Sequence, residues 1–345
     1  MVCAVEFCSR PCPIQAESPE TGLATLLEDH KDGGFCKISG LQLPFCYSRP
    51  MTNERASHEC TKSIGFRVTF LTLLLAATLG EKGFTEETNV TSLLAWQGNT
   101  VDDWHGFKRF HFAIAGCQAW VVEPRKPLHG NPWSWCLEFP DAFTERCATL
   151  QLLDAGYFSA HIVVGNTFGC PKAVEQFNAF YQKLTAQGLN AKPVLIGISR
   201  GGLYAYRWAA ENPGKVGAIY GDAPVCDFKS WPAGKGKGQG SPEDWQALIR
   251  AYGFRDEAEA LAYTNNPIDT LARLAAARVP IIHVVGDSDD VVPVAENTAI
   301  LETRYRRLGG TIKVIHKQGV GHHPHGLDDP APVVDFILKN NLAGG

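Results

Sequence analysis

A serine flanked by glycines, in the run Gly197-Ile198-Ser199-Arg200-Gly201, constrains the fold more than any other part of the sequence. A short apolar segment, 192–196, precedes this run, and a segment with helical periodicity, 203–213, follows it and ends in proline. This order predicts a buried strand, a tight turn and a helix. Glycines are expected around such a turn because a side chain there would collide with the neighbouring strand or helix. The serine hydroxyl would then project from the end of a strand, beside a helix N-terminus.

Segments typical of strands and helices alternate through the chain from about residue 105. Apolar runs predict strands at 107–118, 119–124, 132–139, 157–165, 216–220, 279–285 and 311–316. Helices are predicted at 141–154 and at 171–187, the second with Pro171 in its first turn and Gly188 after its last. This alternation predicts an α/β fold with a mostly parallel sheet that helices cover on both faces. Functional side chains of such a sheet gather where its strands end.

Two polar loops late in the chain supply the partners that a reactive serine needs. The loop 286–293 (Gly-Asp-Ser-Asp-Asp-Val-Val-Pro) follows the predicted strand at 279–285, and the loop 319–325 (Gly-Val-Gly-His-His-Pro-His) follows the last strand. With the serine run, this order of serine, acid and histidine resembles the α/β-hydrolase superfamily over about residues 105–342. The resemblance implies an α/β-hydrolase fold that carries a small helical lid insertion and needs no cofactor.

The resemblance implies three catalytic residues. The acid loop is similar to the G-x-x-D-x-x-V-P form, which places the carboxylate at Asp289, and the last loop is similar to G-x-G-H, which places the base at His322. Ser199 would attack a carbonyl carbon after His322 takes its proton, and Asp289 would hold the imidazole in the required tautomer. Neighbouring residues remain as alternatives, Asp287 and Asp290 for the acid and His323 and His325 for the base.

The backbone near the serine is expected to bind the oxyanion that forms on the substrate. One donor should be the N–H of Arg200, and the second should be the N–H of Glu138 or Phe139, after the predicted strand at 132–139. The Arg200 side chain is also a candidate for binding a substrate carboxylate, and the Ser-Arg pair resembles glucuronoyl esterases. The cysteine before the serine and the lysine after the glycine in that family are absent here. The alternative is that Arg200 simply pairs with Glu138.

Residues 226–278 interrupt the alternation of strands and helices. They contain a glycine- and lysine-rich loop, 234–240, and two segments with helical character, 242–252 and 256–263. An insertion at this point is expected to form a lid that excludes water from the site. Further candidates for substrate binding lie near its start. They are Trp231, which would stack on a substrate ring or anchor the lid, Lys229 beside it, and Asp222, which would contact substrate or cap a turn.

The N-terminal part is predicted to be separate from the catalytic domain. The apolar stretch 68–79 is too short for a membrane span, and lysine and arginine precede it, as in a signal peptide. Met51 lies at the right distance to be the true start. We therefore expect residues 1–50 to be a spurious or disordered extension, 51–80 to act as a signal peptide, and 81–345 to be an α/β-hydrolase domain. This predicts export to the periplasm or the extracellular space.

Composition and charge narrow the function classes. A net charge of −4 and the absence of a basic stripe argue against a nucleic-acid partner. The histidine tract at 322–325 is of a kind that binds metal, but no second cluster has ligand spacing, so no metal is expected. The odd number of cysteines after residue 81 (Cys117, Cys136, Cys147, Cys170 and Cys226) predicts at least one free thiol.

Three functions remain open from the sequence. The first is a secreted serine esterase that cleaves small-molecule or carbohydrate esters, including acyl or uronate esters. The second is a serine peptidase of the prolyl-oligopeptidase kind, and the third is a non-catalytic binding protein on the same fold. Fold analogy does not choose among them, and the sequence makes no prediction of oligomeric state.

Overall fold

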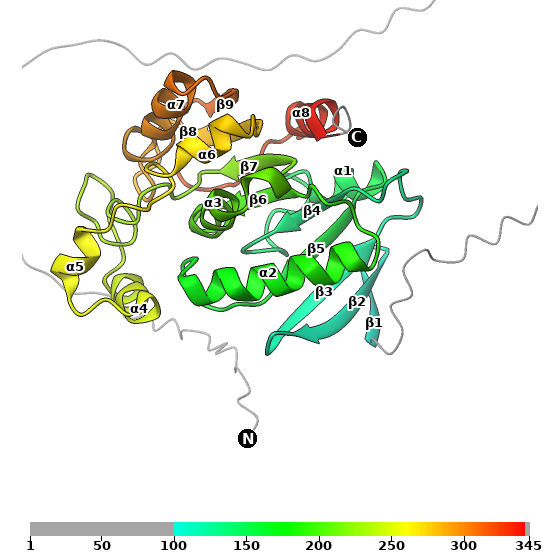
Figure 1. Ribbon diagram of the computed structural model, residues 1–345. Coiled ribbons are helices and arrows are strands. Elements are labelled where there is room, and N and C mark those ends of the chain that lie inside the picture. The colour runs from blue at the N-terminus through cyan, green and yellow to red at the C-terminus, as the bar shows by residue number, and fades with distance from the viewer. Residues whose placement is uncertain (1–99, 342–345) are drawn as a thin grey trace, which may run out of the picture. The chain divides into compact units, whose positions relative to one another are not determined.

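Residues 100–341, which the computed structural model describes, form a nine-stranded sheet with the order β1-β2-β3-β5-β4-β6-β7-β8-β9 (Figure 1). The first three strands and the β3–β5 pair are antiparallel, and every pair from β5 to β9 across the sheet is parallel. The strands are Thr100–Trp104 (β1), Phe107–Ile114 (β2), Cys117–Glu123 (β3), Trp133–Cys136 (β4), Phe158–Ile162 (β5), Val194–Ile198 (β6), Ala218–Asp222 (β7), Ile281–Gly286 (β8) and Ile312–Lys317 (β9).

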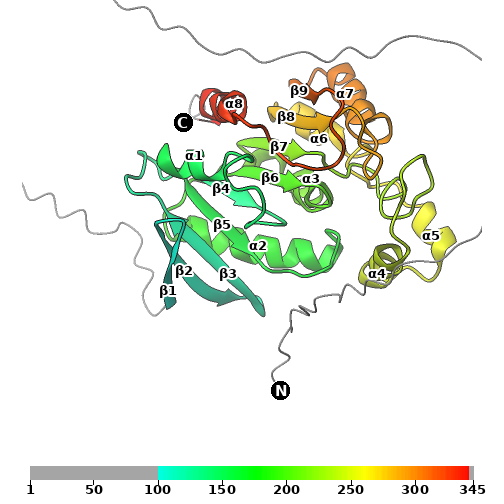
Figure 2. The same cartoon turned by 180° about the vertical axis from the view of Figure 1, so that it is seen from behind.

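Helices cover both faces of this sheet. The helices of the described residues are Thr149–Asp154 (α1), Pro171–Ala186 (α2), Gly201–Glu211 (α3), Pro242–Tyr252 (α4), Glu257–Leu261 (α5), Leu271–Ala276 (α6), Thr298–Arg307 (α7) and Ala331–Asn341 (α8), of which all but α4 and α5 pack on the sheet. Apolar side chains of α2, α3, α6 and α7 share one buried cluster with the sheet, whereas those of α1 and α8 share another. The two views in Figures 1 and 2 show α1 and α8 together on the side away from α2 and α3. The predicted α/β-hydrolase architecture, with a mostly parallel and doubly covered sheet, is therefore confirmed.

The central strands are buried on both faces, which explains their uninterrupted apolar sequences. All five residues of β6 and all five of β7 are buried. Parallel strands covered by helices on both sides have no solvent-facing side, so they show no alternation of polar and apolar residues. The two clusters meet at these strands, and the carboxyl end of β6 leads directly into the Ser199 turn.

Several predicted boundaries differ from the structure. The run 107–124 is a hairpin of β2 and β3, with Ala115 and Gly116 at positive φ in its turn. The helix predicted at 141–154 begins only at Thr149, because Phe143 and Ala148 adopt left-handed backbone conformations that a helix cannot contain. The helix predicted at 171–187 is confirmed, with Gly188 at φ 101° just beyond it.

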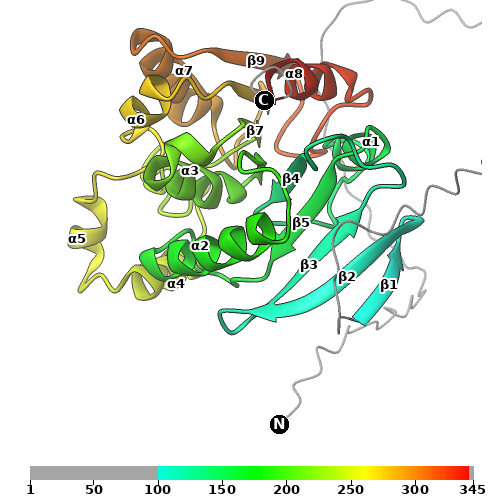
Figure 3. The ribbon, with the colours of Figure 1, turned by 45° about the vertical axis from the view of Figure 1, so that its right-hand side comes forward.

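The insertion between β7 and β8 carries α4 and α5, as predicted, and also α6. Figures 1 and 3 show α4 and α5 beyond the end of α2 and α3, whereas α6 lies with the helices on the sheet. Ser241 caps the N-terminus of α4 by accepting a hydrogen bond from the Asp244 N–H, and Asp256 caps α5 in the same way. Both helices therefore begin at a side-chain cap.

The predicted extension at 1–50 and signal peptide at 51–80 lie outside the described residues. Among residues 100–341, no helix combines the length and the apolar character that crossing a membrane requires. The five cysteines in this part of the chain are all buried and all free. Burial raises the pKa of Cys136 to about 12 and also raises the pKa of Cys117, Cys147 and Cys226.

Acid is expected to destabilise the fold through His283. Its imidazole is fully buried on β8 between the Tyr206 hydroxyl (2.7 Å) and the Thr298 hydroxyl (3.0 Å), and burial lowers its pKa from 6.5 to about 3. Between these values the unfolded chain binds a proton that the native protein does not, so stability falls as pH drops below about 6.5. In His283→Gln, the loss of unfolding free energy between pH 7.5 and 4.5 should shrink by about 2–3 kcal/mol.

Urea unfolding at the two pH values measures this difference. The control is His129→Gln, which replaces an exposed histidine and should leave the pH dependence unchanged. An identical pH dependence in the native protein and in His283→Gln would mean that His283 does not carry the effect.

Candidate active site

Ser199 lies in a strained turn between β6 and α3. Its φ is +50°, a left-handed conformation that is costly for a residue other than glycine, and its N–H donates to the Asp222 carbonyl oxygen on the neighbouring strand (2.8 Å). A methyl group added to Gly197 would lie 2.9 Å from the Gly201 carbonyl oxygen, and one added to Gly202 would lie 2.6 Å from the Val225 carbonyl oxygen. The glycines therefore let β6, α3 and the chain after β7 approach one another closely.

Ser199, His322 and Asp289 form a continuous hydrogen-bonded chain. The Ser199 Oγ lies 2.9 Å from Nε2 of His322, and Nδ1 of the same ring lies 2.8 Å from Oδ2 of Asp289. The His322 and Asp289 side chains are 7% and 1% exposed. The second Asp289 oxygen accepts hydrogen bonds from the N–H groups of Val291 (3.0 Å) and Val292 (2.8 Å). These bonds fix the carboxylate in its loop, so that it holds one orientation of the imidazole.

The neighbouring acids have other partners. Asp287 contacts His316 (2.7 Å) on β9, and Asp290 accepts a hydrogen bond from the side chain of Gln239 (2.8 Å). Both are exposed, whereas Asp289 is buried against the imidazole. Of the three aspartates that the sequence left open, Asp289 is thus the one that the structure brings to His322.

The loop after β4 approaches the Ser199 turn. A methyl group added to Gly201 would lie 3.2 Å from Cβ and 3.8 Å from the backbone nitrogen of Glu138. Within residues 100–341, the backbone N–H groups of Arg200, Glu138 and Phe139 donate no hydrogen bond. Phe139 has a φ of +56° and an exposed side chain, which is unusual for phenylalanine. The three N–H groups that the sequence proposed as oxyanion donors are therefore free of protein acceptors.

The Arg200 side chain is engaged by protein groups on several sides. Its Nε and one terminal nitrogen donate to Oε1 of Glu138 (2.9 and 2.6 Å), and the latter nitrogen also donates to Oδ1 of Asn166 (2.9 Å). The other terminal nitrogen lies 3.6 Å from Oδ1 of Asp244 on α4. Burial raises the pKa of Glu138, and the nearby guanidinium lowers it in part. This arrangement favours the ion-pair alternative over an arginine that is open to a substrate carboxylate.

Two of these partners were not predicted as site residues. Asn166 follows β5, and Asp244 lies in the first turn of α4, 44 positions after Arg200 in the chain. Local patterns mark Asp244 only as a residue near a helix N-terminus. Its contact with Arg200 depends on how the insertion folds back to the Ser199 turn, and nothing in the sequence near either residue signals that contact.

Asp222 is fully buried at the end of β7 and does not face an open site. One carboxylate oxygen contacts Nδ1 of His325 (2.7 Å), and the other accepts hydrogen bonds from the Tyr220 hydroxyl (2.7 Å) and the Gly326 N–H (2.9 Å). Burial raises its pKa, but the contacts with His325 outweigh this, and the pKa lies below its ordinary value. The structure therefore favours a structural role for Asp222, whose carboxylate occupies Nδ1 of His325.

Removal of the Asp222 carboxylate should destabilise the protein strongly. Asp222→Ala leaves His325, the Tyr220 hydroxyl and the Gly326 N–H buried without their partner, which should lower the free energy of unfolding by about 3–5 kcal/mol. Urea unfolding measures the loss. Asp287→Ala is the control, because it breaks an exposed pair with His316 and should cost no more than about 1 kcal/mol. Equal losses in the two variants would contradict this role of Asp222.

The remaining candidates lie at the start of the insertion. Trp231 is partly buried, packs against the apolar core and has its ring 6.4 Å from that of Phe168, which fits the lid-anchor alternative. Lys229 borders a hollow of about 210 Å³ together with Asp227, Lys235 and Glu296. The lining residues of that hollow do not include Ser199, His322 or Asp289. Within residues 100–341, neither side chain is hydrogen-bonded to Ser199, His322 or Asp289.

Known proteins resemble this chain in fold. A puromycin-hydrolyzing peptidase of Mycobacterium tuberculosis is 15% identical with a TM-score of 0.52, over 70% of this chain and 39% of that one. Dipeptidyl peptidase 4 of Porphyromonas gingivalis is 14% identical with a TM-score of 0.51, over 70% and 36%. A putative dipeptidyl aminopeptidase IV of Bacteroides ovatus is 11% identical with a TM-score of 0.52, over 71% and 37%. This chain thus spans less than two fifths of each of those structures.

Sequence comparison gives the family. No curated protein matches the chain. Residues 128–336, which run from before β4 into α8 and include Ser199, Asp289 and His322, match the profile described as the alpha/beta hydrolase family. This match covers more than half of the chain, and the order of strands agrees with it. The chain is a member of the alpha/beta hydrolase family.

Proposed function

We propose that this protein is a serine hydrolase that cleaves carboxylic esters through an acyl-enzyme. The observation that carries the proposal is the hydrogen-bonded chain from Ser199 Oγ through His322 to Asp289. Ser199 is the nucleophile, His322 the general base and Asp289 the carboxylate that orients the imidazole. A non-catalytic binding protein would have no need for this geometry at a strained turn.

The geometry supports the following mechanism. His322 takes the hydroxyl proton as Ser199 Oγ attacks the carbonyl carbon, and Asp289 stabilises the imidazolium that forms. His322 then gives the proton to the leaving alcohol, the acyl group stays on Ser199, and a water molecule activated by His322 releases the acid. The N–H groups of Arg200 and of Glu138 or Phe139 serve as the oxyanion donors, because they carry no protein acceptor and border the Ser199 turn.

Charges beside the nucleophile favour one kind of acyl group. Two carboxylates, Glu138 and Asp244, face the single guanidinium of Arg200, so this group of side chains has a net negative charge when all three are ionised. A free carboxylate on the substrate would be repelled there, whereas a substrate amine would be attracted. The carboxyl group of a uronate ester is uncharged until it is released, so these charges weigh against a substrate with a further free carboxylate and not against a uronate ester itself.

Peptide hydrolysis is the second candidate function, and the same charges favour it. An aminoacyl or dipeptidyl substrate carries a free amine close to its scissile carbonyl. The similar structures named above, with TM-scores above 0.5, are those of peptidases. An amide passes through the same acyl-enzyme as an ester. The choice between ester and peptide then depends on how well the site protonates and releases an amine.

Covalent labelling tests the hydrolase proposal without knowledge of the substrate. A fluorophosphonate probe should react with the native protein, and mass spectrometry should place the adduct on Ser199. Ser199→Ala should take no label, whereas Ser288→Ala, an exposed serine in the loop of Asp289, should label like the native protein. Absence of label in the native protein, or label on another residue, would overturn the proposal.

A matched set of substrates then separates the candidates. Hydrolysis rates are compared for p-nitrophenyl acetate, alanine p-nitroanilide, N-acetylalanine p-nitroanilide and a glucuronic acid methyl ester. An esterase cleaves the first and leaves the anilides, whereas a peptidase cleaves alanine p-nitroanilide, with kcat/KM above that of the N-acetyl form if the negative side chains bind the amine. Rapid cleavage of the glucuronic acid methyl ester alone would identify a uronate esterase, and faster cleavage of the N-acetyl anilide than of alanine p-nitroanilide would contradict the charge argument.

Export is part of the proposal and rests only on the sequence of residues 51–80. The experiment is N-terminal sequencing of the protein secreted by a host that processes signal peptides. A mature N-terminus near residue 81 supports export, and one well upstream of residue 70 contradicts it.

A further inference from the structure

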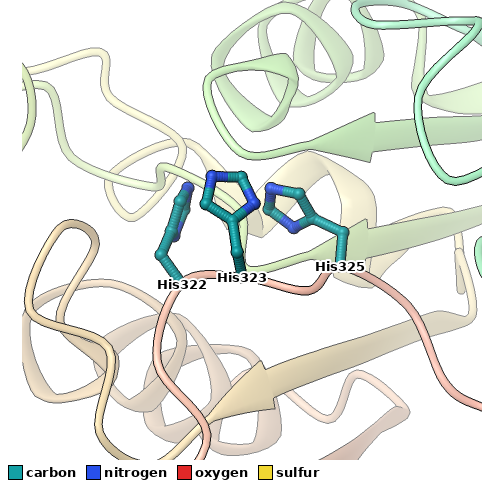
Figure 4. A group of neighbouring side chains, drawn as sticks. All are labelled: His322, His323 and His325. Carbon is teal, nitrogen blue, oxygen red and sulfur yellow. The ribbon is translucent and has the colours of Figure 1, made fainter. Parts of the chain in front are cut away.

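The loop that carries His322 holds two more histidines next to it, and the three rings stand side by side (Figure 4). Ring centroids of His322, His323 and His325 are 4.7–5.0 Å apart. One nitrogen from each ring lies within 4.8 Å of those of the other two. We propose that these three histidines form an inhibitory site for Zn²⁺ or a similar divalent transition metal, which captures the catalytic imidazole.

Two of the rings are already oriented as metal ligands are. Asp289 contacts Nδ1 of His322 at 2.8 Å, and Asp222 contacts Nδ1 of His325 at 2.7 Å. In zinc proteins a ligating histidine usually donates its other ring N–H to a carboxylate, which fixes the tautomer and makes the free nitrogen more basic. The two aspartates therefore leave Nε2 of both rings available to an ion, and both carboxylates are buried.

The third ring, that of His323, is the one that an ion in solvent can reach and that can change its orientation. His323 is exposed, between two buried histidines, and its ring stacks on that of Phe143 at 5.9 Å. A tetrahedral zinc site with Zn–N distances of about 2.1 Å needs ligand nitrogens about 3.4 Å apart. Where the ligand atoms are farthest apart, at up to 4.8 Å, they must approach by somewhat more than 1 Å. Rotation of the exposed His323 side chain moves its nitrogen relative to the other two. Water would complete the four ligands.

Binding of the ion and hydrolysis exclude each other. Nε2 of His322 is the atom that receives the Ser199 proton, and it lies 2.9 Å from Ser199 Oγ. A metal on this nitrogen removes the base and breaks the hydrogen bond that activates the hydroxyl. The inhibition rests on the proposed serine hydrolase function, whereas the binding of metal does not.

The binding is measured on Ser199→Ala, which keeps all three histidines and cannot hydrolyse substrate by the proposed mechanism. Zinc is titrated in competition with a chromophoric zinc indicator, and cobalt absorption reports the coordination number. Ser199→Ala should bind one Zn²⁺ in this loop. His323→Gln, added to Ser199→Ala, removes one of the three ligands. Loss of a residue that only supports a ligand weakens metal binding by about 10- to 100-fold, so loss of a ligand should weaken it at least as much. His129→Gln, which removes an exposed histidine elsewhere, is the matched control and should bind as Ser199→Ala does.

Inhibition is measured on the protein with Ser199 intact. Zinc should stop fluorophosphonate labelling and hydrolysis, a chelator should restore both, and His323→Gln should need at least about tenfold more zinc, relative to its own zinc-free rate. Binding by Ser199→Ala without any hydrolysis in the native protein would support the metal site and overturn the proposed function. Equal zinc binding with and without His323, or no binding at all, would overturn the metal site and leave the hydrolase proposal standing.

Discussion

Ser199→Ala is expected to lower kcat by about 10⁵- to 10⁶-fold, measured with the substrate that the native protein hydrolyses fastest. An effect of this size is seen when a serine protease loses its nucleophile. No other hydroxyl contacts Nε2 of His322 among the residues that the structure describes, so the variant has no replacement nucleophile at hydrogen-bond distance. The Ser199 side chain is small and its turn is held by backbone bonds, so unfolding in urea should change little. The measurement is steady-state hydrolysis with protein from two independent preparations, which exposes contamination by host enzymes.

The control for this prediction is Ser288→Ala. Ser288 is exposed, in the loop of Asp289, and its replacement should change kcat less than twofold if only Ser199 is the nucleophile. A Ser199→Ala enzyme within tenfold of the native rate would exclude the acyl-enzyme and move the proposal to a mechanism in which His322 activates water directly.

Asp289→Asn is expected to lower kcat by about 10⁴-fold while the protein stays folded. The carboxylate accepts from the imidazole at Nδ1 and from two backbone N–H groups. An asparagine amide that turns its NH₂ toward Nδ1 would favour the other tautomer, with the proton on Nε2, so that His322 could not accept the proton of Ser199. The pH dependence and kcat of hydrolysis, measured beside circular dichroism of the folded protein, separate this effect from unfolding.

Asp290→Asn and Asp287→Asn are the matched controls, because they make the same change in the same loop. Asp290 contacts Gln239 and Asp287 contacts His316, both exposed, so each variant should keep at least a third of the native kcat. If Asp290→Asn lost as much activity as Asp289→Asn, the acid would not be Asp289 alone, and the tautomer argument would be wrong.

The part of the site that the sequence predicted is the part that local rules determine. The Ser199 turn needs glycines at fixed offsets, and Asp289 and His322 each follow an apolar strand by a short loop. In a parallel sheet all three loops emerge at the same edge, so their convergence follows from strand order alone. The sequence could therefore predict that Ser199, Asp289 and His322 converge, whereas the hydrogen bonds that join them come from the structure.

The parts that the sequence missed depend on packing. The helix expected from residue 141 begins only at Thr149, because Phe143 and Ala148 have left-handed backbone conformations. The loop that they form lies beside the last histidines, where the Phe143 ring contacts that of His325. The helices α7 and α8 have polar and apolar residues in mixed order and were not predicted, although they bury Leu301, Tyr305, Val333 and Ile337. Tertiary burial of a few side chains stabilises such helices more than their local propensity does.

The pairing of Arg200 could not be read from its neighbours in sequence. Glu138, Asn166 and Asp244 come from three separate segments and meet only when the loops after β4 and β5 and the insertion converge. Electrostatic partners of this kind are determined by tertiary structure. A sequence motif at the nucleophile therefore shows that a charged side chain is present, but not whether that side chain is free to bind a substrate.

The five buried cysteines of the described part of the chain can serve as probes of local opening of the fold. Each is 8% exposed or less, and burial keeps the thiols of Cys117, Cys136, Cys147 and Cys226 protonated by raising their pKa. A maleimide therefore modifies each one only during a transient opening of the segment around it. Because the five belong to different strands, loops and helix ends, peptide-resolved rates of modification would map which segments open independently and which open only when the whole sheet comes apart.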